Sequence, residues 1–531
     1  MNLFDAIFAQ NPSSPAICFG RRIITYSELR AETLRIAGVL QHLGAGAGDR
    51  VALLLHDSPV FIEAFIATCS LGAIAVPINM ALRADEQCSI LHNSGAALAF
   101  MESDTCNALL THAPEKLRHL KNIVSIKPND EPDGDRVSIS ERQLRNPPLT
   151  IYDLMDLLDQ PGADTQPEFP QPERDDPAFI LYTSGSTGEP KGAVHCQSDI
   201  FYTNETFCHE VLRLTPQDRL FSSSRLPFAY GLGNSFSFPL LNGATMILCR
   251  EKPSPDLIAR LFQDQRPTIF FGVPVIYNLL LEYHRRGSKL DCSSLRLCVS
   301  AGEALPAYLG EEWEREFGVQ LIDGIGSTEM LHMFMSNHEN EVRYGSSGRL
   351  LKGYEARLLD EHGEPTPDGV EGDLWIKGDS AARGYWENPE ATANTFVDGW
   401  VRTGDLYHCD SDGFWFHMGR SDDCFKSSGQ WVSPVEVEGA LLRHTGVARV
   451  AVVEDFDSDQ LACACAFVVK QEVEFDSGQL EQELRKLLSQ SLPRFKQPRR
   501  YVFVTELPYT ATGKIQRFKL RRKLRANNAK P

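Results

Sequence analysis

Helix-like and strand-like segments alternate along the first part of the chain, between residues 24 and 82. The periodicity predicts helices over 26–43 and 59–71, and short apolar strands over 50–55 and 73–77. This alternation is typical of β–α–β units built around a mostly parallel sheet. Strand patterns recur at 178–182, 268–271, 295–300 and 319–322. We therefore expect an α/β fold whose large N-terminal part contains mostly parallel sheets.

The pattern changes twice further along the chain. After about residue 343 the sequence is richer in Gly, Asp and short β-type runs such as 355–359 and 372–376, which predicts a β-rich subdomain. After residue 419 it predicts a compact α+β unit, with helices at 434–442 and 480–492 and strands at 450–454 and 464–469. We expect an N-terminal domain over 1–420 and a small mobile C-terminal domain over 421–531. The Pro- and Asp-rich segment 127–177 predicts a surface excursion.

Charge and cysteine content exclude several classes of protein. The 531 residues carry 53 Lys and Arg against 71 Asp and Glu, a formal charge of −18, which argues against binding nucleic acid or anionic lipid. The 13 cysteines form no Cys-x-x-Cys pair and indicate neither a disulfide framework nor a zinc ribbon. The N-terminus has no signal-peptide pattern, and the most apolar long segment, 60–82, is interrupted by Glu63 and Pro77. We expect a cytoplasmic protein that does not enter a membrane.

The end of the chain departs from this acidic balance. From residue 494 onwards, Lys and Arg face a single acid, Glu506. A segment of this kind is either a solvated helix face or a surface that attracts a phosphorylated ligand.

The strongest chemical signal is the run from Tyr182 to Gly192, with the sequence Tyr-Thr-Ser-Gly-Ser-Thr-Gly-Glu-Pro-Lys-Gly. Successive backbone N–H groups and small hydroxyl side chains can wrap a polyphosphate without obstruction. The run is not a Walker loop, because the strand-like Ala193-Val194 follows Lys191 in place of a helix. The candidate phosphate-binding residues are Thr183, Ser184, Gly185, Ser186, Thr187, Gly188 and Lys191.

Four further motifs follow in order: Gly326-Ser-Thr-Glu329, Arg402-Thr-Gly-Asp405, a segment from Gly419 to Gly429, and Thr512-Gly-Lys-Ile515. With the phosphate loop, they closely resemble the signature of the adenylate-forming superfamily, which includes acyl- and aryl-CoA ligases, peptide-synthetase adenylation domains and firefly luciferase. The resemblance implies activation of a carboxylic acid as acyl-AMP, with ATP, Mg²⁺ and, for the CoA ligases, coenzyme A.

The resemblance assigns roles to individual residues. It implies that Thr328 contacts phosphate, that Glu329 holds Mg²⁺, and that Lys514 bridges the carboxylate and the α-phosphate. These groups suit the chemistry, because phosphates and a carboxylate need compensating charge. The resemblance also implies that Asp405 accepts hydrogen bonds from the ribose hydroxyls with Arg420 beside it. The segment Gly302, Glu303 and Ala304 would lie against adenine, and Asp323 would lie near the adenine amino edge.

One residue departs from the superfamily pattern, and other segments indicate a particular branch of the superfamily. Many members of the superfamily have Tyr before the Gly of the Gly-x-Thr-Glu motif, and here Ile325 holds that place. Four segments are similar to the benzoate-CoA ligase branch, which activates benzoate and 2-aminobenzoate: Ser300 to Pro306, Asp323 to His332, Ser336-Asn337, and Pro227 to Asn234. A flat ring needs a closed slot of aromatic and small residues. The candidates are Phe228, Ala229, Tyr230, Ala301, Gly302, Ile325, Gly326 and His332. Phe228 and Tyr230 could equally be core residues, and His332 would reach the slot if the turn after Glu329 is helical.

The resemblance further implies that one site performs two half-reactions. Asp422 would be the hinge about which the C-terminal domain swings, removing Lys514 and presenting a segment that includes Lys426, Ser428 and Gly429 to the CoA pantetheine. The expected function is an ATP-dependent aryl-CoA ligase. The alternatives are an enzyme that loads an acyl carrier protein, a luciferase-like monooxygenase and a non-catalytic relative.

Overall fold

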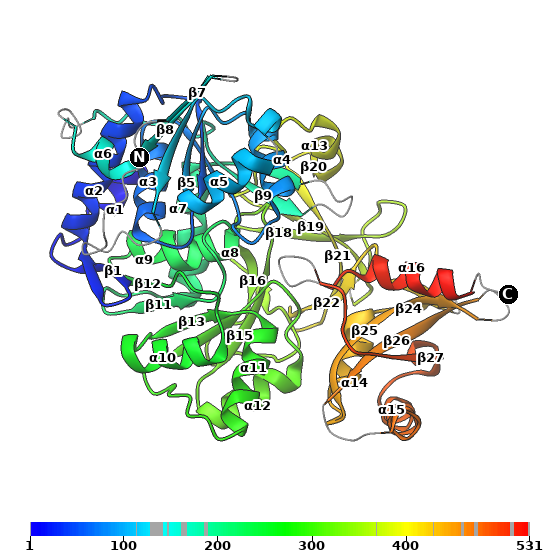
Figure 1. Cartoon of the computed structure of the whole chain (residues 1–531). Helices are drawn as coiled ribbons and strands as arrows, with labels where there is room; N and C mark the ends of the chain where they lie inside the picture. Colours follow the sequence, from blue (N-terminus) through cyan, green and yellow to red (C-terminus); the bar gives the residue numbers. More distant parts are fainter. Residues whose placement is uncertain are drawn as a thin grey trace.

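The computed structural model describes residues 2–112, 114–127, 142–145, 148–160, 167–184, 190–367, 369–427, 430–457, 461–471, 476–509 and 515–528. Two large, mostly parallel sheets form the N-terminal part of the chain, and a smaller unit lies to one side of them (Figure 1). This is the α/β architecture that the alternating pattern predicts. The expected strands and helices are present, and most of their ends lie within about two residues of the predicted ends, which is the usual uncertainty of element boundaries.

The first sheet has the strand order β17-β16-β15-β14-β13-β11-β12-β1-β2. Its strands are β1 (Pro15–Phe19), β2 (Arg22–Thr25), β11 (Arg219–Ser222), β12 (Thr245–Leu248), β13 (Ile269–Gly272), β14 (Leu297–Ser300), β15 (Leu321–Gly326), β16 (Met333–Ser336) and β17 (Arg349–Leu350). The strands from β1 to β15 pair in parallel across this order, so the carboxyl ends of β13, β14 and β15 lie at one edge. Ligands of open α/β sheets bind at that edge.

The second sheet has the strand order β10-β9-β4-β3-β5-β6-β8-β7. Its strands are β3 (Arg50–Leu54), β4 (Ile74–Pro77), β5 (Leu98–Glu102), β6 (Asn122–Ile126), β7 (Arg142–Arg145), β8 (Pro148–Asp153), β9 (Pro177–Ser184) and β10 (Pro190–Cys196). The segment 127–177 is therefore not only a surface excursion, and that prediction was wrong in part. Strand β8 pairs in parallel with β6, and Ile151 and Leu154 are buried. The many polar residues of the segment hid the short apolar strand.

Helices fill the space between the two sheets and cover their outer faces (Figure 1). Buried residues of α2 (Tyr26–His42) and α3 (Pro59–Ser70) share one core with strands of both sheets. Helices α10 (Pro255–Gln265), α11 (Pro274–Arg285) and α12 (Ala307–Phe317) pack on the outer face of the first sheet. The remaining N-terminal helices are α1 (Leu3–Ile7), α4 (Ala84–Ser94), α5 (Ser103–His112), η1 (Pro114–Leu117), α6 (Leu154–Leu158), α7 (Gln197–Thr203), η2 (Asn204–Leu212), α8 (Ala229–Leu232), η3 (Gly233–Ser237), α9 (Phe238–Leu241) and α13 (Pro389–Thr395).

The β-rich subdomain is present where the composition shifts. It contains β18 (Glu355–Leu359), β19 (Gly372–Lys377), β20 (Phe396–Val397), β21 (Trp400–Cys409) and β22 (Trp415–Arg420). The antiparallel pair β21–β22 places Asp405 opposite Arg420.

The C-terminal unit is α+β, as expected. Its strands are β23 (Phe425–Ser427), β24 (Gln430–Val432), β25 (Val447–Phe456), β26 (Ala462–Lys470) and β27 (Arg500–Val504), and its helices are α14 (Pro434–Leu441), α15 (Ser477–Ser491) and α16 (Arg517–Asn528). Helices α14 and α15 cover one face of the three-stranded sheet. Leu520 and Leu524 of α16 cover the other face, so the basic C-terminal segment is an amphipathic helix packed on the domain.

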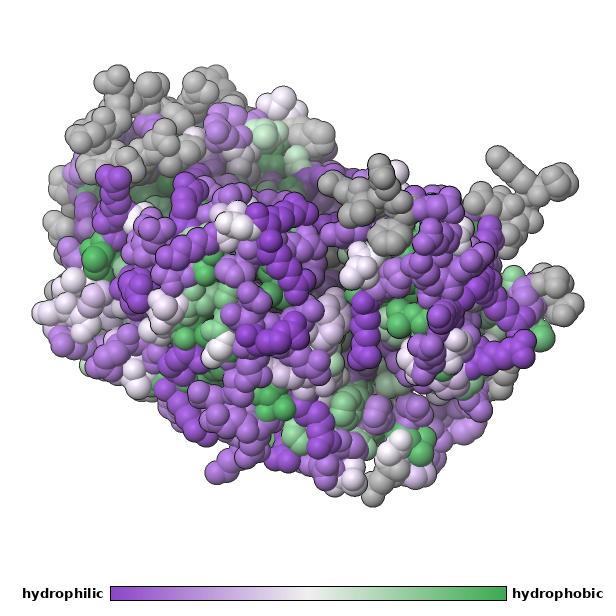
Figure 2. All heavy atoms as spheres, turned by 90° about the horizontal axis from the view of Figure 1, so that it is seen from below, coloured by the Kyte–Doolittle hydropathy of each residue, from purple (hydrophilic) through white to green (hydrophobic). Residues whose placement is uncertain are grey.

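The surface seen in Figure 2 is largely hydrophilic, and its hydrophobic residues lie in small separate patches. Among the residues that the structure describes, no helix has the length and apolar character needed to cross a bilayer. The same residues contain no group of three or more His, Cys, Asp and Glu side chains arranged to hold a metal ion.

Gly348 fixes the junction between the first sheet and the β-rich subdomain. Its φ is +83°, and a Cβ there would lie 1.9 Å from the backbone carbon of Ser336. Its carbonyl accepts a hydrogen bond from the Trp415 amide at 2.8 Å. We predict that Gly348→Ala lowers the free energy of unfolding by more than the roughly 1–2 kcal/mol that positive φ alone costs.

Gly363 provides a matched control. Its φ is also +83°, but nothing lies within 4 Å of a Cβ built there. Chemical denaturation should therefore show a clearly smaller loss for Gly363→Ala than for Gly348→Ala. Equal losses of unfolding free energy would mean that the backbone at Ser336 shifts to accommodate the added Cβ at no cost.

Candidate active site

Two predicted residues, Glu329 and Lys191, meet at Tyr385, where the carboxyl end of β15 faces the start of β10. Glu329 lies in the turn after β15, and its Oε1 accepts a hydrogen bond of 2.6 Å from the Tyr385 hydroxyl. The Nζ of Lys191 lies 5.4 Å from the centroid of the Tyr385 ring, within cation–π distance. Burial, reinforced by the nearby Glu329 carboxylate, raises the pKa of Tyr385, which keeps the hydroxyl a donor. Tyr385 therefore connects the candidate phosphate lysine to the candidate metal carboxylate.

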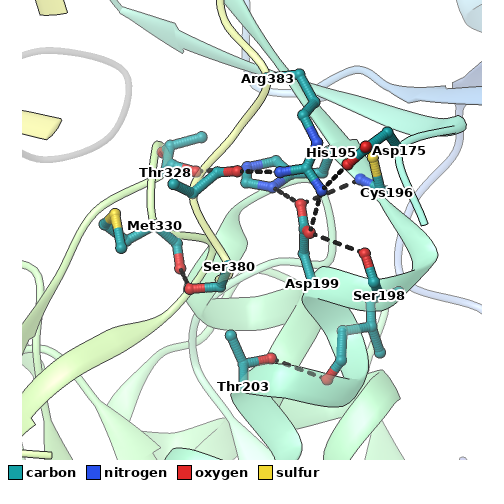
Figure 3. Close-up of polar contacts among 12 residues, drawn as sticks. Asp175, His195, Cys196, Ser198, Asp199, Thr203, Thr328, Met330, Ser380 and Arg383 are labelled. Carbon is teal, nitrogen blue, oxygen red and sulfur yellow. Dashed lines mark hydrogen bonds and ion pairs between the residues drawn. The ribbon is translucent and has the colours of Figure 1, made fainter. Parts of the chain in front are cut away.

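The turn that carries Thr328 and Glu329 is held by its backbone. The Nε2 of His195 lies 2.8 Å from the Thr328 carbonyl oxygen, and the Ser380 hydroxyl donates to the Met330 carbonyl at 2.9 Å (Figure 3). Between them, the Ala382 amide donates to the Glu329 carbonyl at 2.8 Å. The turn is not helical, because Leu331 adopts φ +64°. Three successive carbonyls are thus fixed by groups from two distant segments.

Asp405 and Arg420 form a second polar cluster. The Asp405 Oδ1 lies 3.3 Å from Arg420 Nη1 and 3.3 Å from His417 Nε2, and Arg420 Nη1 also donates to the Thr403 carbonyl at 2.7 Å. Gly404 has a φ of +73°, and a Cβ there would lie 2.7 Å from Arg420 Nη2, so a larger residue would require the guanidinium to shift. Arg420 also interacts electrostatically with Glu329, which places this cluster beside the first one.

Asp323 is a buried carboxyl with an incomplete set of partners. The Leu305 amide donates to its Oδ2 at 3.4 Å, and its Oδ1 has no hydrogen-bond partner in the described part of the chain. Burial raises its pKa well above the ordinary value. An unpaired buried acceptor costs free energy and is a fitting place for a ligand amino group.

The segment Gly302–Ala304 follows β14 at the same edge as Asp323. Gly302 has a φ of +90°, and both Gly302 and Glu303 are exposed. Glu303 interacts electrostatically with Arg517 of the C-terminal unit, so this edge faces that unit.

Aromatic rings surround His332. Its ring centroid lies 4.9 Å from Phe207, 4.7 Å from Phe238 and 5.7 Å from Tyr230. Both of its ring nitrogens lack a hydrogen-bond partner among the described residues, and so do both amide atoms of the fully buried Asn234 on η3. Burial lowers the pKa of His332 to about 3, so its imidazole is neutral at physiological pH.

The other candidates for the aryl slot lie close by. The Tyr230 hydroxyl donates to the Val299 carbonyl at 3.0 Å, and Tyr230, Ala301 and Ile325 contact the same hydrophobic cluster. Phe228 and Ala229 begin α8. Gly326 can carry no side chain, because a Cβ there would lie 2.4 Å from the His332 carbonyl oxygen.

Not every predicted residue can be placed. Thr183 and Ser184 end β9, and Thr183 pairs with Lys191 of β10. The Nζ of Lys426 lies 3.3 Å from the Glu361 carboxylate, and the Asp422 carbonyl accepts a hydrogen bond of 3.3 Å from Arg521. The candidates outside the described residues are Gly185, Ser186, Thr187, Gly188, Ser428, Gly429 and Lys514.

Sequence reasoning missed the residues that support the site. His195, Ser380 and Tyr385 lie in segments without a glycine-rich or charged motif, and their contacts join positions far apart in the chain. For Tyr385 and Ser380, no signal in the sequence marks the partner. For His195, the only signal is the spacing to Asp199, an i, i+4 pair at the start of α7.

Comparison with known proteins gives this arrangement a class. The model of the AMP-binding enzyme family matches residues 4–386, and that of the AMP-binding enzyme C-terminal domain matches residues 436–514. The chain belongs to this family. Within it, the chain is an AMP-forming acid–thiol ligase of the aryl-CoA ligase group, on the following similarities.

The benzoate–CoA ligase of Thauera aromatica is 39% identical over 507 residues, which cover 94% of this chain and 90% of the relative. The anthranilate CoA ligase AuaEII, solved in complex with anthranoyl-AMP, superposes with a TM-score of 0.90 at 34% identity and covers 100% of this chain and 98% of its own. A benzoate CoA ligase from Burkholderia xenovorans LB400 superposes with a TM-score of 0.84 at 36% identity, covering 98% and 100%. The predicted superfamily and fold are confirmed.

The neutral state of His332 leads to a prediction about pH. The ordinary pKa of 6.5 applies in the unfolded chain and about 3 in the folded one. As the pH falls below about 6.5, the unfolded state binds more protons, so His332 lowers the free energy of unfolding by about 1.4 kcal/mol at pH ~5.5. NMR of ¹⁵N-histidine-labelled protein should show a neutral His332 ring from pH ~8 down to ~5.5, with the signal assigned through His332→Gln. Titration of that signal near pH 6.5 would contradict the prediction.

Proposed function

We propose that the chain activates a small aromatic carboxylic acid, of the benzoate or 2-aminobenzoate type, and transfers it to coenzyme A. The observation that carries this proposal is the cage of rings around His332, which lies directly behind the turn that presents Thr328 and Glu329. A flat apolar ring packs well against aromatic side chains, and the carboxylate attached to that ring would point toward the charged end of the site. The similarity to benzoate and anthranilate CoA ligases supports the same assignment.

The first half-reaction joins the acid to AMP. A carboxylate oxygen attacks the α-phosphorus of ATP, the bond to the β-phosphate oxygen breaks, and pyrophosphate leaves with that electron pair. In our proposal, Lys191 and Thr328 hold the phosphates, Asp405 and Arg420 hold the ribose, and the unpaired oxygen of Asp323 accepts the adenine amino group. The donors and acceptors present fit ATP.

The same site fits a magnesium ion. Mg²⁺ is usually bound by one or two carboxylates together with substrate phosphates and water, and Glu329 supplies the carboxylate. When bound, the ion would compensate the phosphate charge. The Tyr385 hydroxyl fixes Glu329 for this role with its 2.6 Å hydrogen bond.

The second half-reaction forms the thioester. The CoA sulfur attacks the aryl carbonyl carbon, the bond to AMP breaks, AMP leaves as the anion, and the thiol proton passes to solvent. We propose that domain 421–531 turns about Asp422 between the two steps, exchanging Lys514 for the segment with Lys426, Ser428 and Gly429. Few polar contacts described here oppose such a rotation, among them the exposed pair between Lys426 and Glu361 and the 2.6 Å hydrogen bond from Ser421 to Asp373.

A substrate panel tests the reaction class. With ATP, Mg²⁺ and CoA, we expect pyrophosphate release for benzoate, 2-aminobenzoate or hydroxybenzoates, and none for medium-chain fatty acids. Four buried polar atoms of His332 and Asn234 have no hydrogen-bond partner among the described residues. We therefore expect an aromatic acid whose ring carries an amino or hydroxyl group to be activated more efficiently than benzoate. Turnover of fatty acids would refute the aryl assignment. Pyrophosphate release with no CoA thioester would favour the alternative, the loading of an acyl carrier protein.

Lys514→Ala tests the proposed division of labour. Loss of one transition-state charge contact costs ~10²–10³ in rate, so aryl-AMP formation should fall by that factor. Thioester formation from supplied aryl-AMP should be retained, because Lys514 is absent from the second arrangement. Lys519→Ala on α16 is the matched control, since the exposed Lys519 ammonium contacts only its neighbour Phe518 among the interactions described. Equal loss of both half-reactions would refute the two-step rotation.

A further inference from the structure

A buried histidine–aspartate pair lies beside the candidate site and has no role in the proposed chemistry. The side chains of His195 on β10 and Asp199 on α7 are both 0% exposed, and His195 Nδ1 lies 2.8 Å from Asp199 Oδ2. The other ring nitrogen lies 2.8 Å from the Thr328 carbonyl oxygen (Figure 3). The imidazole therefore spans the distance between a carboxylate and the turn that follows β15.

The two partners of the His195 ring determine which atoms donate and which accept. An ionised carboxylate and a carbonyl are both acceptors, and a ring that donates from both nitrogens satisfies the two together. Asp199 also accepts from the Cys196 amide at 3.1 Å and from the Ser198 hydroxyl at 3.3 Å, and Arg383 Nη2 lies 3.7 Å from it. A charge-assisted hydrogen bond is shorter and stronger than a neutral one. The Thr328 carbonyl is therefore held firmly in position.

Burying polar side chains such as His195 and Asp199 costs free energy, which suggests that the pair serves to fix the position of the Thr328 carbonyl rather than to add stability. A buried ion pair is weak evidence for stability, because desolvation offsets much of the attraction, and apolar residues of the same volume often serve as well. Here the pair acts on a backbone atom whose neighbours along the chain are held too, through the Ala382 amide and the Ser380 hydroxyl. The turn has a single set of backbone partners and therefore a single position.

The pair also connects two parts of the site. Lys191 and His195 are four positions apart on β10, so their side chains point to the same face of the strand. Tyr385 forms a bridge with Ala193 between them and donates to Glu329. Strand β10 therefore determines how far Lys191 lies from the turn that carries Thr328 and Glu329.

We propose that His195 and Asp199 are positioning residues for phosphate activation: they hold the Thr328 hydroxyl and the Glu329 carboxylate at a fixed place relative to Lys191. The inference rests on the proposed function in one respect, that these three groups act on the phosphates of ATP. His195 contacts the backbone of Thr328 and acts through it, without touching the nucleotide.

The test compares two replacements of the same ring. In His195→Gln, the side-chain amide can still donate to the Thr328 carbonyl, whereas His195→Leu offers no donor. Misplacement of a reacting group by about 1 Å costs ~10²-fold in rate, so His195→Leu should lower kcat for pyrophosphate release by about that factor with KM for the acid almost unchanged. His195→Gln should recover a large part of the loss. Asp199→Asn should fall between the two.

Thr203→Val is the matched control, because Thr203 is buried on the same helix and donates only within that helix, to the Ile200 carbonyl at 3.0 Å. Thermal unfolding of every variant separates folding from positioning. A calorimetric titration with a non-hydrolysable ATP analogue, with and without Mg²⁺, supplies a readout that needs no turnover. In wild type and His195→Gln, Mg²⁺ should tighten binding of the analogue, and in His195→Leu that gain should be lost.

The outcomes are distinct. If His195→Gln and His195→Leu show the same kcat and the same gain from Mg²⁺, and differ only in unfolding temperature, the pair is structural and the inference is wrong. If wild type releases no pyrophosphate with any acid, the proposed function fails, and the comparison of analogue binding between the two variants still decides for or against the pair.

Discussion

The backbone of the turn after β15 has to form its hydrogen bonds inside the protein, while the turn presents Thr328 and Glu329, the candidate phosphate and metal ligands. Its carbonyls at Thr328, Glu329 and Met330 accept from an imidazole, a backbone amide and a hydroxyl. A buried carbonyl without a partner costs free energy comparable to a lost hydrogen bond, so these donors must all be in place together. The donors come from β10 and from the segment that follows β19. The position of the turn therefore depends on the second sheet and on the β-rich subdomain as well as on its own strand.

This dependence explains how one site is assembled from three parts of the fold. The segment from Ser380 to Trp386 lies between β19 and α13, and it bonds to the turn through Ser380 and Ala382 and to β10 through Arg383 and Trp386. In contrast, the described contacts between the C-terminal unit and the large domain include one ion pair with exposed side chains, Lys426 with Glu361, and a hydrogen bond from Ser421 to Asp373. Exposed pairs contribute little free energy, which is consistent with a rigid N-terminal site and a C-terminal unit that can move.

The sequence allowed the prediction of features that depend on neighbouring residues. Apolar runs between turn residues predicted the strands at 50–55 and 355–359, and the glycine- and hydroxyl-rich run predicted a strand–loop–strand at Lys191. It also associated Tyr230 with His332, although the condition given for His332 to reach the slot, a helical turn after Glu329, is not met, because Leu331 has a positive φ. Tyr385 and the bond from His195 to Thr328 were not predictable, because each joins residues more than fifty positions apart. Strand β8 was missed because polar residues surround its short apolar core.

The two buried histidines of the candidate site, His195 and His332, have different electrostatic surroundings. His195 faces a carboxylate and a carbonyl, and a ring that donates to both strengthens the charged end, where phosphates and a carboxylate must be held. His332 lies against the rings of Phe207, Phe238 and Tyr230, and burial lowers its pKa to about 3. A charged imidazole at that place would attract the carboxylate of an aromatic acid and bind the molecule in reverse. In the proposed function, the neutral ring leaves the positive charge at the phosphate end, so the proposed aromatic acid would enter with its carboxylate toward Lys191 and Arg420. The proposed direction of binding thus rests on burial at one end of the site and charge at the other.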